Sequence, residues 1–369
     1  MALLERLVLA SFAGPGGLTR LDLEELTGLS RTVVAGMVSS LLARGELVET
    51  REPPAPGARG RPPARYQRAA LLPPVLLIQL TKDGATSVSS VSGDGTRSLA
   101  ADCAPWSAPW RTWSRSVADA VGLLRARSQA PPRLAVLSAP FPVAEGQGAP
   151  RMHEVPAEDE PMRGWRMAPR ARWLEEDPRP ALSDRLGCTT LLVNDANLAA
   201  LGEARFGAGR GRRAVFHVSV VGGIGAGFVF EGRLFTGAHG FSGELAHVQV
   251  TADGKACPCG NHGCLATEVR CGPGHAPGDR AELGPLVGRA LAPLVTTLDP
   301  DCVVVDARLA GQAAAFMAGV TSELARRCPP QVAVAVVAGE LEDAQRFGAL
   351  AAADAHAVTL LSQPAWPAL

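Results

Sequence analysis

Four potential metal ligands lie close together in the segment 243–264, and they restrict how this part of the chain can fold. The four fall within eighteen residues and are His247, Cys257, Cys259 and Cys264. Three thiolates and one imidazole can fill the four positions of a tetrahedral structural zinc site. Gly260 and Gly263 permit the tight backbone that such a loop needs. The spacing predicts a zinc site, and the alternative is a group of buried free cysteines beside a surface histidine.

The composition favours a globular protein with more than one domain. The chain has 369 residues, of which 47% are hydrophobic, and its 36 basic and 36 acidic residues give a net charge of zero. Its global charge therefore identifies no partner. No apolar run reaches membrane-spanning length, and the first residues lack the basic start of a signal peptide. Because three of the eight cysteines cluster as metal ligands, we expect a reducing, cytoplasmic location and no membrane partner.

Residues 1–50 predict three short helices, of which the second and third form a helix-turn-helix. Thr19 and Asp22 have the spacing of a capping box at the start of the second helix. The expected buried side of that helix comprises Leu23, Leu26 and Leu29. The third helix follows the cap residue Ser30 and stops at Gly45. In this layout the third helix presents its first turn to the major groove of DNA. The alternative interpretation of residues 1–50 is a small helical protein-interaction module.

A basic segment after these helices predicts a wing. Residues 51–68 contain five arginines and one acid, between two short extended stretches. Guanidinium groups there can neutralise phosphates or enter a narrow minor groove, although a solvated linker has the same composition. The predicted DNA contacts are Ser30, Arg31, Thr32, Arg59 and Arg61. We therefore expect residues 1–72 to form a winged helix-turn-helix domain.

Residues 73–369 predict a second domain of the α/β class. A meander of strands, a helix and a buried strand follow Pro73, and a later strand ends at Asn194 and Asp195, where a helix begins. Polar groups at such a strand end commonly bind ligands in α/β proteins, although either residue could simply cap the helix. The glycine-rich stretch 222–227 lies between two strands, so it is not a dinucleotide-binding fingerprint.

Several motifs together resemble the ROK family of repressors and sugar kinases. They are LTRLDLEELTGLSRTVV, VNDANLAALGEARFGAG, VGGIGAGFVFEGRLFTGAHGFSGELAH and CPCGNHGC, in this order. The resemblance implies a two-lobed actin/hexokinase-like (ribonuclease H-like) domain, a sugar site between the lobes, a structural zinc ion and a homodimer or homotetramer. It assigns the zinc to the four ligands above and the sugar contacts to Asn194, Asp195, Glu244 and His247. Asp195 stands at the position of the general base of the kinases.

Three departures from this resemblance argue against kinase activity or binding of a plain hexose. The Asp-x-Gly-Gly-Thr loop of family kinases corresponds to residues 79–83, QLTKD, without the acid or the glycines. The Gly-Gly pair expected near adenosine is Asp306-Ala307. The glutamate expected two residues after the last zinc cysteine is Ala266, and losing a charged hydrogen bond to a sugar costs about 1.5–3 kcal/mol.

We therefore expect a DNA-binding transcriptional regulator, a repressor that is not an enzyme. It would bind a palindromic DNA operator, and a sugar-like effector would shift the lobes and the spacing of two DNA-binding heads. The competing hypothesis is an ATP-dependent sugar kinase for a hexose or amino sugar, with an accessory DNA-binding domain. A third is a DNA-binding protein without an effector.

Overall fold

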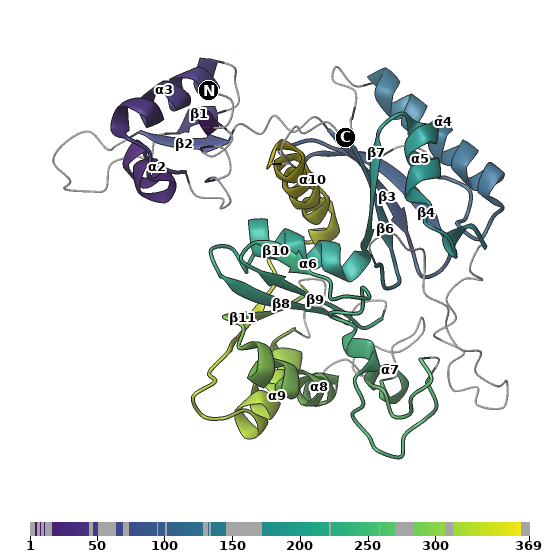
Figure 1. The fold of residues 1–369 in the computed structure, drawn as a ribbon. Helices are drawn as coiled ribbons and strands as arrows, with labels where there is room; N and C mark the ends of the chain where they lie inside the picture. Colours follow the sequence, from purple (N-terminus) through teal and green to yellow (C-terminus); the bar gives the residue numbers. More distant parts are fainter. Residues whose placement is uncertain are drawn as a thin grey trace, which may run out of the picture.

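The chain has a mixed α/β fold with two five-stranded sheets and a small N-terminal unit that holds a two-stranded sheet (Figure 1). The computed structural model describes residues 4–5, 8, 11, 17–43, 47–50, 64–68, 74–93, 95–99, 102–127, 132, 134–144, 172–220, 223–257, 259–269, 283–306 and 313–362. The predictions made for Arg59, Arg61 and Ala307 lie outside these residues. None of the described helices is by itself long and apolar enough to span a membrane, and only α2 and α3 taken together pass that test, across a 116° bend.

The N-terminal unit contains two helices in the predicted helix-turn-helix layout. Helix α2 (Arg20–Thr27) begins with the predicted capping box, in which the Asp22 amide donates to the Thr19 hydroxyl at 3.2 Å and the Thr19 amide donates to the Asp22 carboxylate at 2.7 Å. Gly28 ends this helix in the left-handed conformation, with φ +67°. Helix α3 (Arg31–Ala43) follows at 116° to α2, within the range that helix-turn-helix pairs adopt.

One small hydrophobic core joins these helices to the two-stranded sheet. Its buried members are Val8, Leu23, Val34, Met37, Val38, Leu41, Leu47 and Tyr66. The prediction that Leu26 is buried is wrong, because this side chain is 61% exposed. The helices cross steeply, so α3 covers α2 only near Leu23, which is fully buried.

The two short strands occupy the positions predicted for a wing. Strand β1 (Leu47–Thr50) pairs antiparallel with β2 (Arg65–Arg68). Tyr66 in β2 also exchanges backbone hydrogen bonds of 2.7 and 2.8 Å with Leu18, ahead of α2. The Arg20 guanidinium lies 5.5 Å from the centre of the Tyr66 ring. The strands are thereby attached to the start of the helix-turn-helix.

The first lobe is built on a sheet with the order β5-β4-β3-β6-β7. Its strands are β3 (Val75–Leu80), β4 (Thr86–Val91), β5 (Arg97–Leu99), β6 (Leu134–Ala139) and β7 (Thr189–Asn194). The predicted meander β3–β4–β5 is antiparallel, whereas β6 and β7 run parallel to β3. Helices α4 (Trp110–Arg127) and α5 (Arg179–Leu186), with the short helix η2 (Arg172–Leu174), contribute to the core on one face of this sheet.

The second lobe is built on a sheet with the order β10-β9-β8-β11-β12. Its strands are β8 (Ala214–Ser219), β9 (Gly225–Phe230), β10 (Arg233–Phe235), β11 (Cys302–Val305) and β12 (Ala335–Ala338). Strands β8, β11 and β12 are parallel, and the β8–β9–β10 hairpins are antiparallel. The core on one face includes the helices α7 (Leu265–Glu268), α8 (Leu283–Leu298) and α9 (Ala313–Arg327).

Two helices join the lobes: α6 (Asp195–Phe206) and α10 (Ala344–Ser362) lie side by side (Figure 1). Both contribute to one core that also takes buried residues from the first and the second sheet. The helices meet at glycines, since a Cβ built on Gly202 would lie 3.0 Å from the Gly348 amide nitrogen, and one built on Gly348 would lie 3.0 Å from Leu198 Cα. Helix α6 therefore has a fixed place between the lobes, and its N-terminus carries Asn194 and Asp195.

Replacing Gly348 with alanine should destabilise the protein by about 1–3 kcal/mol, because the new Cβ meets the Leu198 backbone and no rotamer can relieve the overlap. Denaturant unfolding measures this change. Gly122→Ala in α4 is the matched control, since it meets nothing within 4 Å and should stabilise by about 0.5–1 kcal/mol. Equal effects of the two substitutions would contradict the close helix crossing.

Candidate zinc centre and effector site

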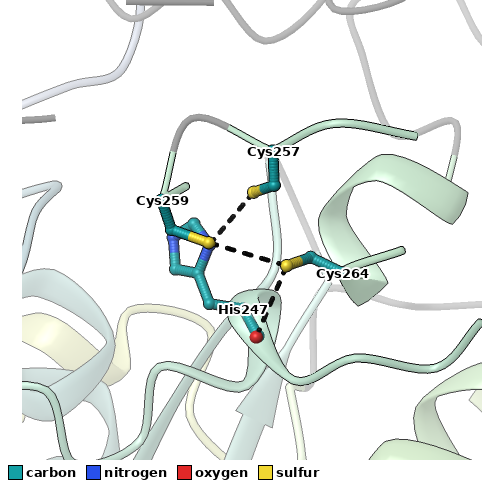
Figure 2. A group of neighbouring side chains, drawn as sticks. All are labelled: His247, Cys257, Cys259 and Cys264. Atoms are coloured by element: carbon teal, nitrogen blue, oxygen red, sulfur yellow. Dashed lines mark hydrogen bonds between the residues drawn. The ribbon is translucent and has the colours of Figure 1, made fainter. Parts of the chain in front are cut away.

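The four predicted zinc ligands converge in the structure, where one ligand atom from each lies within 4.8 Å of the others. Figure 2 shows the side chains pointing toward one another from three successive segments of the second lobe. His247 Nδ1 lies 3.4 Å from Cys257 Sγ, and Cys259 Sγ lies 3.6 Å from Cys264 Sγ. Ligands on a tetrahedral zinc ion with Zn–S bonds of about 2.3 Å are separated by about 3.5–3.8 Å. The donor set and its spacing therefore fit zinc.

The backbone around the ligands forms a compact loop in which glycines are required. The Gly260 amide donates to the Cys257 carbonyl at 2.9 Å, and Gly260 has φ +91°. Gly263 has φ +63°, and a Cβ there would collide with the Thr251 carbonyl. Its amide donates to the Lys255 carbonyl at 2.8 Å. Only glycine satisfies both the left-handed conformation and the close backbone contact at 263, which supports the sequence-based interpretation of this loop.

Burial affects the protonation of the ligands. It lowers the pKa of His247, which favours the neutral imidazole that binds metals. It raises the pKa of the Cys257 and Cys264 thiols, and neighbouring cysteines contribute to the shift. A divalent cation reverses this effect by stabilising the thiolates, so the four side chains are suited to a cation.

The start of α6 places Asn194 and Asp195 at the carboxyl end of β7, as predicted. Asn194 is buried, accepts from the Asn197 amide at 3.0 Å and donates to the Phe141 carbonyl at 3.1 Å. It is therefore a helix cap that also ties α6 to the segment after β6. Asp195 is half-buried, and its carboxylate accepts from the Ala196 amide at 2.8 Å.

The charge of Asp195 acts on Glu244, so two of the predicted effector contacts interact electrostatically. Burial raises the pKa of Glu244 to about 7, the negative charge of Asp195 adds to this shift, and the positive charge of Lys82 opposes it. Three residues further along, the His247 amide donates to the Glu244 carbonyl at 3.0 Å. The short helix η3 (Leu245–His247) thus connects the carboxylate to the metal ligand.

The chain matches the ROK family model over residues 161–272, the segment that holds Asp195, Glu244 and the four metal ligands. This segment is therefore similar to the ROK family.

Proteins similar to this chain include both repressors and kinases. The xylose repressor of Bacillus subtilis strain 168 is 34% identical over 96 residues, which is 26% of this chain and 25% of the repressor. A glucokinase of Thermotoga maritima is 46% identical over 94 residues, 24% of this chain and 30% of the kinase. The matches thus span less than a third of the length of these relatives.

The similarity in fold to solved structures extends over nearly the whole chain. The crystal structure of a ROK family transcriptional regulator, a homologue of the E. coli MLC protein, superposes with a TM-score of 0.71 at 18% identity and covers 98% of both chains. The chain, with its N-terminal unit, therefore shares the fold of that crystal structure.

The loop that departs from the ROK kinases is held in a polar network. Gln79, which the resemblance aligns with the kinase aspartate, accepts from Arg97 at 2.7 Å and donates to Gln345 at 2.9 Å. Arg97 also pairs with Asp343 at 2.9 Å, and Ser138 donates to Gln345 at 3.1 Å. A neutral amide beside a guanidinium is an unfavourable environment for a metal cation.

Two further residues that the sequence analysis singled out, Asp306 and Ala266, are buried in the second lobe. Asp306 is buried at the end of β11 and accepts from the Ser219 hydroxyl at 2.7 Å. Ala266 is packed in the core of the second lobe. The carboxylate of Glu268 accepts from the Lys255 amide at 3.3 Å in the metal loop, so it does not replace the missing glutamate of ROK sugar sites.

The described DNA-contact candidates lie on the surface of α3. Ser30, Arg31 and Thr32 are exposed at its start, and the Val34 amide donates to the Ser30 carbonyl at 3.0 Å. Gly36, one turn further on, is exposed and has open space where a Cβ would stand. Among Ser30, Arg31 and Thr32 at the start of α3, Arg31 is the one positively charged side chain.

Sequence reasoning did not identify Lys82 as a residue whose charge acts on Glu244. The only clue in the sequence was a lysine in a turn where the resemblance expects glycine. The effect of its charge on Glu244 depends on how the two lobes pack, so it became evident only in the structure.

Proposed function

We propose that this chain is a DNA-binding transcriptional regulator of the ROK family, a repressor whose kinase-like domain has no catalytic activity. The observation that carries the proposal is a helix-turn-helix pair at 116°, with exposed Arg31 and Thr32, in a chain that matches a ROK regulator over 98% of its length. Residues 1–72 would form the DNA-binding domain and residues 73–369 the effector domain. The protein would be a homodimer or homotetramer on a palindromic double-stranded operator.

In this proposal α3 enters the major groove and Arg31 and Thr32 contact base edges, with Ser30 at the phosphates. Arg59 and Arg61, in the segment between β1 and β2, would contact the backbone or the minor groove. The small side chains along α3 permit close approach of the helix to the groove. Base-specific contacts would be few, so shape and deformability of the operator would contribute to specificity.

Selection of DNA from a random pool, with the full-length protein at moderate salt, tests this function. We expect a palindromic sequence to be enriched. Recovery of no preferred sequence would contradict the proposal.

Arg31→Ala should weaken binding to the selected operator by about tenfold or more, because a bidentate arginine contact with guanine contributes about 1–3 kcal/mol. Fluorescence anisotropy with labelled operator measures the change. Arg111→Ala removes an exposed arginine from α4 in the first lobe and should leave binding unchanged. Equal losses in the two variants would exclude a specific role for Arg31.

The proposed effector site consists of Asp195 and Glu244 with Asn194 and His247 beside them. Two carboxylates can accept hydrogen bonds from neighbouring sugar hydroxyls. Zinc on His247 and the three cysteines would hold the segment that carries Glu244 in place, without taking part in a reaction. Lack of catalysis is supported by Gln79, which pairs with Arg97 and Gln345 where ROK kinases have an aspartate.

The second candidate is a sugar kinase, favoured by the 46% identity over 94 residues to a glucokinase. Asp195 at the start of α6 would take a proton from the attacking sugar hydroxyl. A coupled assay for ADP with a panel of hexoses and amino sugars decides between the two. Phosphorylation that disappears in Asp195→Asn would establish the kinase and overturn the inactive-domain proposal.

A further inference from the structure

The three cysteines of the candidate zinc centre differ in their exposure to solvent. Cys257 and Cys264 are buried, whereas Cys259 is half-buried at the start of a surface turn whose next three residues, 260–262, are exposed. A hydrogen bond of 2.8 Å from the Cys257 amide to the Asn261 carbonyl closes this turn. Cys259 is therefore the thiol of the group that a small molecule in solution meets first.

A second thiol lies within reach of Cys259. Its Sγ is 3.6 Å from the Sγ of Cys264, and Figure 2 shows the two side chains pointing toward each other. The sulfurs of a disulfide bond are about 2.05 Å apart, so the two atoms must approach by about 1.5 Å. Gly260 and Gly263 lie in the short stretch between the two cysteines, where glycine adapts to a small backbone movement more easily than other residues. The pair can therefore be bridged without a rearrangement of the lobe.

The chemistry of the metal site makes these sulfurs nucleophilic. A cysteine that coordinates zinc is held as the thiolate, and the thiolate is the form of cysteine that attacks peroxides and disulfides. A free thiol in the same compartment is mostly protonated at neutral pH and reacts more slowly.

We propose that Cys259 and Cys264 are a redox pair, a modification site at which a hydroperoxide converts two thiolates into a disulfide bond and the zinc ion is released. This inference rests on the candidate zinc centre and is independent of DNA binding.

The reaction has two steps. The Cys259 sulfur attacks the hydroperoxide, so that an S–O bond forms, the O–O bond breaks and an alkoxide leaves, which gives a sulfenic acid at Cys259. The Cys264 sulfur then attacks the Cys259 sulfur, so that the S–S bond forms, the S–O bond breaks and hydroxide leaves. The two sulfurs give up two electrons, and the hydroperoxide is reduced to an alcohol and water once both leaving groups are protonated.

The disulfide would free one part of the loop and leave another attached. His247 and Cys257 remain as metal ligands, and two ligands are too few for a structural zinc site. The His247 amide donates to the Glu244 carbonyl at 3.0 Å, so loss of the metal would loosen the segment that carries Glu244. The Leu265 amide donates to the Val248 carbonyl at 2.8 Å, which keeps the far side of the loop in place.

Treatment of the full-length, zinc-loaded protein with tert-butyl hydroperoxide tests the proposal. A chromogenic chelator follows the release of zinc, and mass spectrometry of peptides locates the disulfide bond. We expect equal amounts of released zinc and of a disulfide bond between Cys259 and Cys264. Dithiothreitol with added zinc should restore the metal content.

Cys103 and Cys188 are internal controls, because they are also half-buried but lie in the first lobe, where burial raises the pKa of both thiols. Cys259 should be oxidised at least about tenfold faster than either, since a free thiol is only a few per cent thiolate at neutral pH. The double variant Cys103→Ser/Cys188→Ser should release zinc at the rate of the wild type.

Cys259→His keeps four metal donors and removes the accessible thiol of the pair. This variant should retain zinc and release it to the hydroperoxide at least about tenfold more slowly than the wild type.

A disulfide bond between any other two cysteines would overturn the proposal, as would retention of zinc after Cys259 is oxidised or equally fast oxidation of Cys103 and Cys188. A wild-type protein that binds no zinc would overturn it as well. None of these measurements involves an operator, so their failure leaves the proposed regulator function to its own test.

Discussion

Cys264→Ser should remove the bound zinc and destabilise the second lobe by ~5 kcal/mol or more. Structural zinc in zinc-finger peptides contributes about 10–16 kcal/mol of apparent binding free energy at neutral pH, and loss of one of four ligands forfeits much of it. Cys264 is fully buried, and its sulfur lies 3.6 Å from Cys259 Sγ and 3.5 Å from the His247 carbonyl. Elemental analysis should find a zinc-to-chain ratio near one in the wild type and far less in the variant.

Thermal unfolding and limited proteolysis of the 248–269 segment measure the structural loss. Cys328→Ser is the matched control because it makes the same change at another buried thiol of the second lobe, bonded at 3.6 Å to the Ala292 carbonyl. A loss of about 1 kcal/mol with full zinc content is expected there. A wild-type protein without zinc, or equal stability of the two variants, would contradict the zinc centre.

The second large effect is expected for Glu203→Ala, at ~3–5 kcal/mol. This fully buried carboxylate accepts from the amides of Ala208 at 2.9 Å, Glu340 at 3.2 Å and Leu341 at 2.9 Å. A buried amide left without an acceptor costs about 1–3 kcal/mol, and the cost is smaller here because these three hydrogen bonds are only partly buried and water can enter. Because Glu203 connects the end of α6 to the segment before α10, we expect looser packing of both helices between the lobes.

Denaturant unfolding measures the loss, and two further variants sharpen the result. Glu203→Gln keeps one acceptor oxygen and should give an intermediate loss. Glu231→Ala removes an exposed carboxylate paired with Arg213 at 3.0 Å and should change stability by less than about 1 kcal/mol. If Glu203→Ala lost no more than Glu231→Ala, the carboxylate would have no structural role.

The order of helices and strands was predictable because it depends on local patterns. The capping box at Thr19 is confirmed, as are the meander β3–β4–β5 and the strand that ends at Asn194. Leu26 is the instructive error: its position in the helix repeat predicts burial, but the steep crossing of α2 and α3 leaves it 61% exposed. Spacing alone identifies an apolar face and does not say how much of it a neighbour covers.

The candidate metal ligands could be found from the sequence because three of them lie within eight residues, where a glycine-containing loop must bring their sulfurs together. The roles of Lys82 and Glu203 were decided only by the tertiary structure. Lys82 meets Gly223 and acts on Glu244, and Glu203 meets amides 137 and 138 residues further along the chain. Such contacts depend on how two lobes pack against α6 and α10, and no short stretch of sequence encodes that arrangement.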